Sequence, residues 1–345
     1  MWSLVAAREP GGPLMDWTTT RDKLLSIAGI RRPSDTRTSD GSARAGSRGV
    51  ASNGHALPRV EKLPNGRGPR LHDAPLAAPR AASLCIASGK GGTGKSVVTA
   101  SLASLFGLSG RTLLLDADLG VGNAHILQNV SPERSLVDVI EGEASVASAI
   151  TRCGGNVELL GAGSGVPRMS ELSPYELHLI ASGVAGVETD YRTLLVDAAA
   201  GISFQTLHFA ASCDVVLVVT TPDLTAMTDA YALFKVLARR QPGFEPFLLV
   251  NRAPNERVAE ETAERIGRVA MRFLGGMPKL IGWCPEDPEV RRCVNERMPV
   301  VLGAPASPFS SAIRTVAVML DEELSRRHPA GFGRRLVDAA GFQAT

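Results

Sequence analysis

Nine residues of the chain, 88–96, have the types and the spacing of a site that binds phosphate groups. They contain the pattern G-x-x-x-x-G-K-[ST], with Gly89 and Gly94 as its glycines, Lys95 as its lysine and Ser96 as its hydroxyl residue. Glycines let backbone N–H groups form a nest for an anion, and the N-terminus of a following helix adds its positive dipole. The lysine reaches the β- and γ-phosphates, and the hydroxyl ligates Mg²⁺. The stretch therefore predicts a loop that binds a nucleoside triphosphate with Mg²⁺.

The flanking sequence favours this interpretation over a glycine-rich turn that merely contains lysines. An apolar run at 84–87 is typical of a buried strand, and apolar residues at helical spacing follow from 97 to 106. Strand, glycine-rich loop and helix in this order are the context in which the pattern marks a P-loop. We predict that the bound nucleotide contacts this stretch through Gly89, Lys90, Gly91, Gly92, Thr93, Gly94, Lys95, Ser96 and Val97.

A second lysine, Lys90, directly follows the first glycine of the loop. An ordinary phosphate-binding loop does not need it, because Lys95 already serves the phosphates. Lys90 has no evident partner within its own loop, so we predict that it meets the phosphates of a nucleotide held by another subunit. The alternative is a solvated loop lysine. We class Lys90 and Lys95 as catalytic, together with one aspartate.

Three aspartates follow apolar runs that are typical of buried strands. Asp116 and Asp118 come after the run 112–115, and Asp197 comes after the run 193–196. Because phosphoanhydride hydrolysis mainly requires positioned charge and a positioned water, we assign the catalytic water to Asp118. Asp197 is predicted to hold Mg²⁺ together with Ser96, and Asp116 to lie in the surroundings of the metal. The alternative for each aspartate alone is a helix cap or a turn residue.

The elements that position these residues alternate along the chain. Strands are expected at 84–87, 112–115, 157–160, 193–196, 215–220, 247–251 and 280–283, with helices at 97–106, 136–150, 173–187, 224–240, 255–274 and 309–327. Fully apolar strands that alternate with helices predict an α/β fold with a doubly wound, mainly parallel sheet and helices on both faces. Ligands in such sheets bind at the carboxyl ends of the strands, where the loop and the aspartates fall.

Composition describes an ordinary globular chain. Of 345 residues, 44% are hydrophobic and 21% charged, and the net charge is +2, which gives no strong attraction to nucleic acid. The five cysteines are scattered without a C-x-x-C pair, which favours reduced thiols in the cytoplasm. The sequence has no apolar run of about 18 residues, so we expect no membrane span.

Four segments follow from shifts in composition along the chain. Residues 1–30 predict a short helical segment, and residues 31–80, which are rich in Gly, Pro, Ser and Arg, predict a disordered basic linker. Residues 81–327 form the predicted nucleotide-binding domain. The segment 328–345 places apolar residues beside Arg334 and Arg335, which is typical of a short membrane-interfacial helix, although its glycines favour a frayed tail.

The loop from Lys90 to Ser96 resembles the deviant Walker A motif of the MinD/ParA family of dimerising P-loop ATPases. In that family the lysine at the position of Lys90 crosses the dimer interface. The resemblance continues through 116–123 and 197–202, which match the family's two switch segments, and through 250–252 and 285–287. It implies ATP as the nucleotide, Mg²⁺ as the metal, and contacts of Asn251, Pro285 and Asp287 with the adenine side.

Within this family the sequence is most similar to the FlhG/FleN branch, which regulates flagellar number. That resemblance implies a homodimer with ATP, an FlhF-type GTPase and flagellar basal-body components as partners, and residues 16–30 as the segment that activates the GTPase. It places the protein in the cytoplasm, with the inner face of the plasma membrane as a candidate surface. The alternatives are a ParA-like ATPase that partitions DNA or cargo, and an anti-activator that binds a flagellar transcription factor. DNA is not an expected partner, because the basic residues of the domain are few.

Overall fold

The computed structural model describes residues 81–120, 122–163, 172–240 and 245–339. The predicted helical segment 1–30 and linker 31–80 lie outside the described residues. The described strands are β1 (Ala82–Ser88), β2 (Thr112–Ala117), β3 (Ile150–Gly154), β4 (Val157–Leu160), β5 (Thr193–Ala200), β6 (Val215–Thr220), β7 (Phe247–Ala253) and β8 (Lys279–Pro285). The described helices are α2 (Lys95–Ser109), α3 (Ala124–Leu127), α4 (Leu136–Glu141), α5 (Val146–Ala149), α6 (Pro174–Ala185), the 3₁₀ turn η2 (Glu188–Asp190), α7 (Phe204–Ser212), α8 (Leu224–Arg240), α9 (Glu256–Leu274), α10 (Pro288–Asn295), α11 (Val300–Gly303), α12 (Pro308–Ser325) and α13 (Phe332–Ala339).

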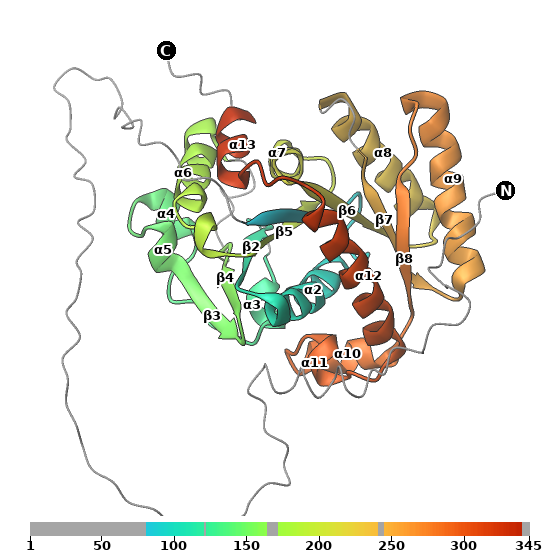
Figure 1. The fold of residues 1–345 in the computed structure, drawn as a ribbon, viewed down its shortest axis with the longest axis horizontal. Coiled ribbons are helices and arrows are strands. Elements are labelled where there is room, and N and C mark those ends of the chain that lie inside the picture. The colour runs from blue at the N-terminus through green and yellow to red at the C-terminus, as the bar shows by residue number, and fades with distance from the viewer. Residues whose placement is uncertain (1–80, 121, 164–171, 241–244, 340–345) are drawn as a thin grey trace, which may run out of the picture. The chain divides into compact units, whose positions relative to one another are not determined.

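These strands form one eight-stranded sheet in the order β3-β4-β2-β5-β1-β6-β7-β8 (Figure 1). Every neighbouring pair is parallel except β3 and β4, which are antiparallel. The predicted fold class is confirmed. Because β1 lies between β5 and β6, the loop that follows β1 is flanked by the loops that follow those two strands. This order brings the predicted site residues to one edge of the sheet.

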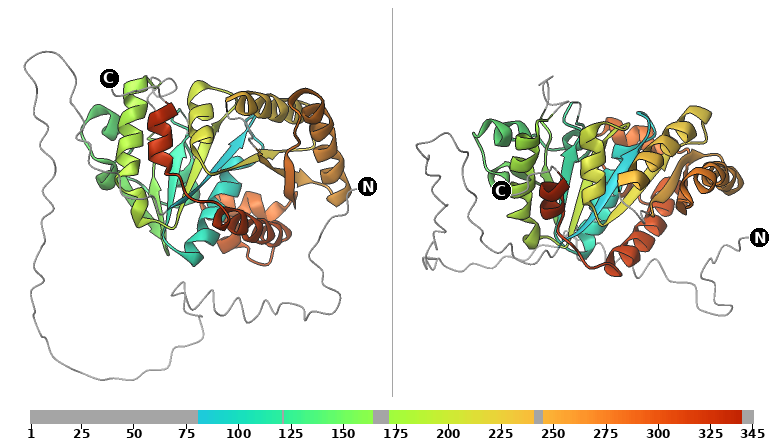
Figure 2. Two further views of the ribbon diagram at one scale, coloured as in Figure 1. Left: turned by 45° about the horizontal axis from the view of Figure 1, so that its top comes forward. Right: turned by 90° about the horizontal axis from the view of Figure 1, so that it is seen from above.

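Side chains of the central strand alternate between two buried layers, as strand geometry requires. Leu84 and Ile86 of β1 pack into the layer that includes α2, α10, α11 and α12. Cys85 and Ala87 pack into the opposite layer, which includes α4, α6, α7, α8, α9 and α13. Figures 1 and 2 show the sheet between these two groups of helices.

Local sequence explains where several helices begin and end. Ser173 caps α6 in a capping box with Glu176, and Pro174 occupies its first turn. Asn255 accepts from the Val258 N–H at the start of α9, and Gly275 ends that helix in the left-handed conformation. The single helix expected at 136–150 is wrong, because Gly142 interrupts it with a φ of 79° and residue 150 already belongs to β3.

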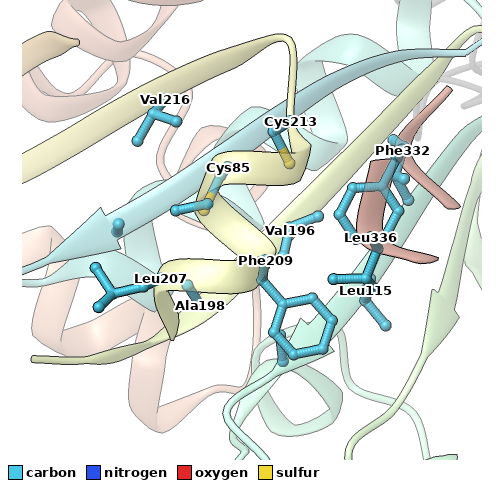
Figure 3. Packing of buried hydrophobic residues seen from close by; sticks show 14 of the residues in the cluster. Cys85, Leu115, Val196, Ala198, Leu207, Phe209, Cys213, Val216, Phe332 and Leu336 are labelled. Carbon is cyan, nitrogen blue, oxygen red and sulfur yellow. The ribbon is translucent and has the colours of Figure 1, made fainter. Parts of the chain in front are cut away.

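Of the segment 328–345, the structure describes residues 328–339, and their helix α13 differs from both expectations for the segment. A helix forms, and its Phe332 and Leu336 are fully buried against α6 and α7 rather than available to a membrane (Figure 3). The Phe332 ring stacks on Phe209 of α7 with centroids 6.3 Å apart. The predicted domain boundary at 327 is therefore too early, because the core includes α13.

Backbone contacts and an ion pair hold α13 in place. Glu188 Oε2 accepts from the Gly333 N–H at 3.2 Å, and Arg335 pairs with Asp214 at 2.6 Å. A Cβ on Gly333 would lie 2.6 Å from the carbonyl oxygen of Ala181, so only glycine allows this close approach to α6. Among the described helices, none is long and apolar enough to cross a membrane.

Candidate functional site

The loop between β1 and α2 has the geometry of an anion nest. Gly92 and Gly94 adopt φ angles of 81° and 88°, in the left-handed region where a side chain would be strained. Gly94 is the residue before α2, so the N-terminus of that helix opens directly onto the loop. The loop therefore presents backbone N–H groups and a helix dipole at one point, as phosphate binding requires.

Lys95 and Asp197 form a buried ion pair behind this loop. Lys95 Nζ lies 2.7 Å from Asp197 Oδ1, and the two side chains are 7% and 1% exposed. The same carboxylate oxygen accepts from Thr99 Oγ1 at 3.0 Å. Lys95 Nζ also lies 3.5 Å from the hydroxyl of Ser96. The structure thus brings together the predicted phosphate lysine, the predicted metal aspartate and the predicted metal hydroxyl.

Sequence reasoning missed Thr99, although a signal for it exists. Thr99 lies four residues after Lys95 on α2, so the two side chains share one face of the helix. Its hydroxyl also donates to the Lys95 carbonyl oxygen at 3.0 Å. Thr99 therefore helps to fix Asp197 opposite the loop.

Gly89 and Lys90 connect the loop to α8. A Cβ on Gly89 would lie 2.1 Å from the carbonyl carbon of Asp229, so this glycine is required by the close approach of α8. Lys90 Nζ donates to Thr225 Oγ1 at 2.8 Å in the first turn of α8. The expectation that Lys90 has no local partner is therefore wrong, although its side chain remains exposed.

Asp116 organises the segment that follows β2. Its Cα pairs in register with that of Asp197 on the neighbouring β5. Its Oδ1 accepts from the Asp118 N–H at 3.2 Å, and its Oδ2 accepts from the Ala124 N–H at 3.1 Å. Burial, and next the charge of Asp197, raise the pKa of Asp116 to about 7. Both carboxylate oxygens of Asp116 thus accept hydrogen bonds from the backbone. Direct contact of Asp116 with a metal stays a prediction.

Gly122 and Asp118 are two neighbours of the Asp116 carboxylate. A Cβ on Gly122 would lie 2.5 Å from Asp116 Oδ2, so glycine is needed where the segment folds back over the carboxylate. Asp118 is half-buried, and the assignment of the catalytic water to it stays a prediction.

The residues predicted for the adenine side line one cavity of about 470 Å³. It is lined by Gly92, Gly94, Val97, Asn251, Arg252, Pro285, Glu286, Asp287, Pro288, Val290, Arg291 and Phe309. Sequence reasoning did not assign Arg252 or Arg291. The only signal for Arg252 is its place next to Asn251, since its left-handed φ of 54° is not visible in the sequence. The structure therefore joins the loop and the ends of β7 and β8 into a single concave site.

Asn251 and Asp287 differ in their freedom to bind a ligand. Asn251 Nδ2 donates to the Thr93 carbonyl oxygen at 2.8 Å, while Asn251 Oδ1 and Thr93 Oγ1 are buried without a partner among the described residues. Such orphaned polar atoms are costly unless a ligand or water satisfies them. Asp287 instead accepts from the Glu289 and Phe309 N–H groups at 2.9 and 3.0 Å, so it holds the wall of the cavity.

The donor set fits a nucleotide with Mg²⁺. In the described part of the chain no group of three or more His, Cys, Asp and Glu residues could hold a metal ion by itself. Mg²⁺ does not require such a group, because it is commonly bound through one or two carboxylates, waters and substrate phosphates. Ser96 and Asp197 are the residues placed to contribute.

Comparison with known proteins agrees with this geometry. Residues 84–300 match the sequence model of the CobQ/CobB/MinD/ParA nucleotide binding domain. The chain is 34% identical over 260 residues to the antiactivator FleN of Pseudomonas aeruginosa, covering 74% of this chain and 92% of FleN. It is 30% identical over 243 residues to the flagellum site-determining protein YlxH of Helicobacter pylori, covering 70% of this chain and 82% of YlxH.

Solved structures give the same likeness. The septum site-determining protein MinD of Pyrococcus horikoshii, complexed with Mg-ADP, superposes with a TM-score of 0.59 at 27% identity, covering 70% of this chain and 96% of that one. MinD in the MinC:MinD cell division protein complex of Aquifex aeolicus superposes with a TM-score of 0.57 at 25% identity, again over 70% of this chain and 96% of that one.

Proposed function

The chain belongs to the CobQ/CobB/MinD/ParA family and is a P-loop ATPase, and from that premise we propose that it is an ATP-dependent dimerising switch that regulates flagellar number or placement. The observation that carries the proposal is the pair of lysines in one loop: Lys95 buried against Asp197, and Lys90 exposed beside α8. Similarity to FleN and YlxH supports the flagellar role.

In the proposed reaction ATP supplies the phosphoanhydride, and Mg²⁺ supplies charge neutralisation at its phosphates. Lys95 exchanges its contact with Asp197 for the β- and γ-phosphates. The Asp197 carboxylate and the Ser96 hydroxyl are the groups that would hold Mg²⁺. Asp118 orients the attacking water. Because Asp116 accepts from the N–H groups of Asp118 and Ala124, the position of Asp118 depends on those contacts.

Dimerisation depends on Lys90 in this proposal. Lys90 leaves Thr225 and donates to the phosphates held by the second subunit, a charge-assisted contact that exists only in the dimer. A contact made in one state only shifts the equilibrium toward that state. Lys90→Ala should bind ATP as a monomer, fail to dimerise and lose ATPase activity. Light scattering with ATP and Mg²⁺ measures this, with Thr225→Ala as the matched control that keeps the lysine. A Lys90→Ala protein that dimerises as wild type does would refute the trans role.

The flagellar role is tested by deleting the gene in its own organism and counting flagella per cell by electron microscopy. We expect an altered number or position, restored by the wild-type gene and not by Lys95→Ala. Unchanged flagella in the deletion strain would contradict the proposal. An FlhF-type GTPase is the proposed partner, with residues 16–30 as the activating segment.

A second candidate is an anti-activator that binds a flagellar transcription factor, favoured by the similarity to the antiactivator FleN. Purified protein mixed with such an activator separates the two, because an anti-activator reduces transcription in vitro without basal-body components. Retention of that effect by Asp118→Ala would make ATP turnover incidental to it.

A further inference from the structure

Thr99 is a buried threonine of α2 whose hydroxyl lies between two acceptors. Its Oγ1 lies 3.0 Å from the Lys95 carbonyl oxygen and 3.0 Å from Asp197 Oδ1. Because a hydroxyl has a single hydrogen, the two acceptors share it in this structure. The Lys95 carbonyl is one turn back in the same helix, where it also accepts the Thr99 N–H in the ordinary helical pattern. The hydroxyl hydrogen can therefore be given wholly to Asp197 without leaving that carbonyl unpaired.

The Asp197 carboxylate has few other donors. Its Oδ1 accepts from Lys95 Nζ at 2.7 Å, and no further hydrogen bond from the described residues reaches either of its oxygens. Asp116, its in-register neighbour on β2, is a second carboxylate, and both of its oxygens already accept from backbone N–H groups. Asp197 is only 1% exposed, and a buried charge without donors is costly. The carboxylate therefore depends on Lys95 and Thr99.

Binding of a nucleotide in the proposed reaction removes one of these two donors. Lys95 leaves Asp197 when it moves to the phosphates, whereas Thr99 stays on the side of α2 that faces β5. We propose that Thr99 is a positioning residue, which holds the Asp197 carboxylate in place after Lys95 has left and so keeps it available to Mg²⁺. This role rests on the proposed exchange of Lys95 and is independent of dimerisation and of the flagellar role.

A second threonine of the chain shows what a purely structural hydroxyl does. Thr262 on α9 is also buried, and its hydroxyl donates to the carbonyl oxygen of Val258, four residues back, at 2.7 Å. No carboxylate accepts from Thr262 in the described part of the chain. Thr99 makes the same contact within its helix at 3.0 Å and adds a charged acceptor from a neighbouring strand. Hydrogen bonds to a charged group are about twice as strong as neutral ones, so the two threonines should respond differently to loss of the hydroxyl.

The first test is a double-mutant cycle on the full chain without nucleotide, measured by urea unfolding. Thr99→Val keeps the shape of the side chain and should lower the urea midpoint only slightly while Lys95 is present. In the Lys95→Met background the same change should lower the midpoint at least twice as far, because Asp197 then has no donor among the described residues. Adding Asp197→Asn to that double variant removes the buried charge. It should recover most of the loss, and should restore folding if the double variant is unfolded.

The second test follows Mg²⁺ with mant-ADP, a fluorescent ADP analogue, bound to the full chain. The Mg²⁺ concentration that gives half of the fluorescence change should rise at least tenfold in Thr99→Val, which is the size expected for loss of a hydrogen bond to a charged group. Thr99→Ser keeps the hydroxyl and should titrate close to wild type. Thr262→Val is the matched control, because it removes a buried hydroxyl that bonds only within its own helix.

Three results would overturn the positioning role of Thr99. They are an equal effect of Thr99→Val with and without Lys95, a Mg²⁺ midpoint in Thr99→Val equal to that of wild type, and a Thr99→Ser protein that behaves as Thr99→Val does. Failure of the wild-type chain to bind mant-ADP would instead contradict the proposed exchange of Lys95. The unfolding cycle uses no nucleotide, so it would still decide whether Thr99 holds Asp197.

Discussion

Lys95 Nζ donates to Asp197 Oδ1 at 2.7 Å, so the cation of the phosphate loop is paired with a carboxylate of the neighbouring strand β5. Both groups are nearly inaccessible to water, and Thr99 adds a second donor to the same oxygen. Each charge therefore depends on the other. A nucleotide can take Lys95 only by offering phosphate oxygens in exchange for Asp197.

This pairing predicts a non-additive effect of two substitutions. Lys95→Met should lower the free energy of unfolding by about 3 kcal/mol, because it leaves Asp197 buried without its cation. Lys95→Met/Asp197→Asn should recover most of that loss, yet neither variant should bind ATP. Urea unfolding and equilibrium dialysis measure the two properties. Additive losses of stability in the double variant would contradict the coupling.

Asp118→Ala is expected to bind ATP and to hydrolyse it about 10²-fold more slowly, since a positioned proton acceptor contributes about that factor. The substitution leaves the backbone N–H that donates to Asp116 in place, so the segment should keep its conformation. Single-turnover hydrolysis separates binding from chemistry. The control is Glu143→Ala, an exposed acid away from the loop. Hydrolysis at the wild-type rate would remove Asp118 from the mechanism.

Asn251→Ala should weaken ATP binding about tenfold, or 1.4 kcal/mol. The amide both holds the phosphate loop through the Thr93 carbonyl and offers an acceptor that has no partner among the described residues. An acceptor at this place suits the amino group of adenine, so the preference for ATP over GTP should fall as well. Asn255→Ala, which removes an exposed cap of α9, is the matched control. Equal nucleotide affinities in the two variants would exclude a role for Asn251.

Much of this site was predictable because its signals are local. A glycine-rich loop between a buried strand and a helix, and aspartates after apolar runs, each fix the local conformation that chemistry needs. Asp116 and Asp197 meet because parallel strands end at the same edge, which follows from the fold class alone. The resemblance to the family placed Asn251, Pro285 and Asp287 together on the adenine side, and the three line one cavity, while their contact with a nucleotide stays a prediction.

Most of the features that sequence reasoning missed depend on distant partners. The short strand β3 is an exception, because it pairs with β4, which begins three residues after β3 ends, and it was missed because its apolar pattern is irregular. Phe332 and Leu336 would have the same spacing in a helix that faces lipid and in a helix that faces a protein core. Only the docking of α13 on α6 shows that they face the core. The contact between Lys90 and Thr225 joins residues far apart in the chain, and no sequence pattern predicts it.

Protonation of Glu188 should make the free energy of unfolding depend on pH. Burial raises the pKa of this carboxyl above its ordinary value of 4.5. The folded chain then binds the proton more tightly than the unfolded chain, so the free energy of unfolding falls as the pH rises from about 4.5 through the raised pKa, and is level above it. Glu188→Gln keeps an acceptor for the Gly333 N–H and removes this slope. Unfolding in urea at pH 5 and pH 8 tests it, and equal slopes in both proteins would contradict the assignment.

A chain of residues 81–339 should fold and bind ATP, because β1 begins at Ala82 and α13 ends at Ala339. A chain of residues 81–327 should be less stable by about 5 kcal/mol, since it loses the fully buried Phe332 and Leu336. Denaturation midpoints and nucleotide titrations compare the two. Equal stabilities would mean that α13 adds nothing to the core.

The position of α13 also sets an order of events during synthesis. It is the last described helix, yet it covers α6 and α7, which are made much earlier, and it completes the layer that contains Phe209. A ribosome-bound chain has therefore made every strand of the sheet before it can close that layer. The apolar faces of α6 and α7 stay open until α13 has left the exit tunnel. Chaperones that bind exposed apolar segments have their opportunity in this interval, and an early stop codon would prolong it indefinitely.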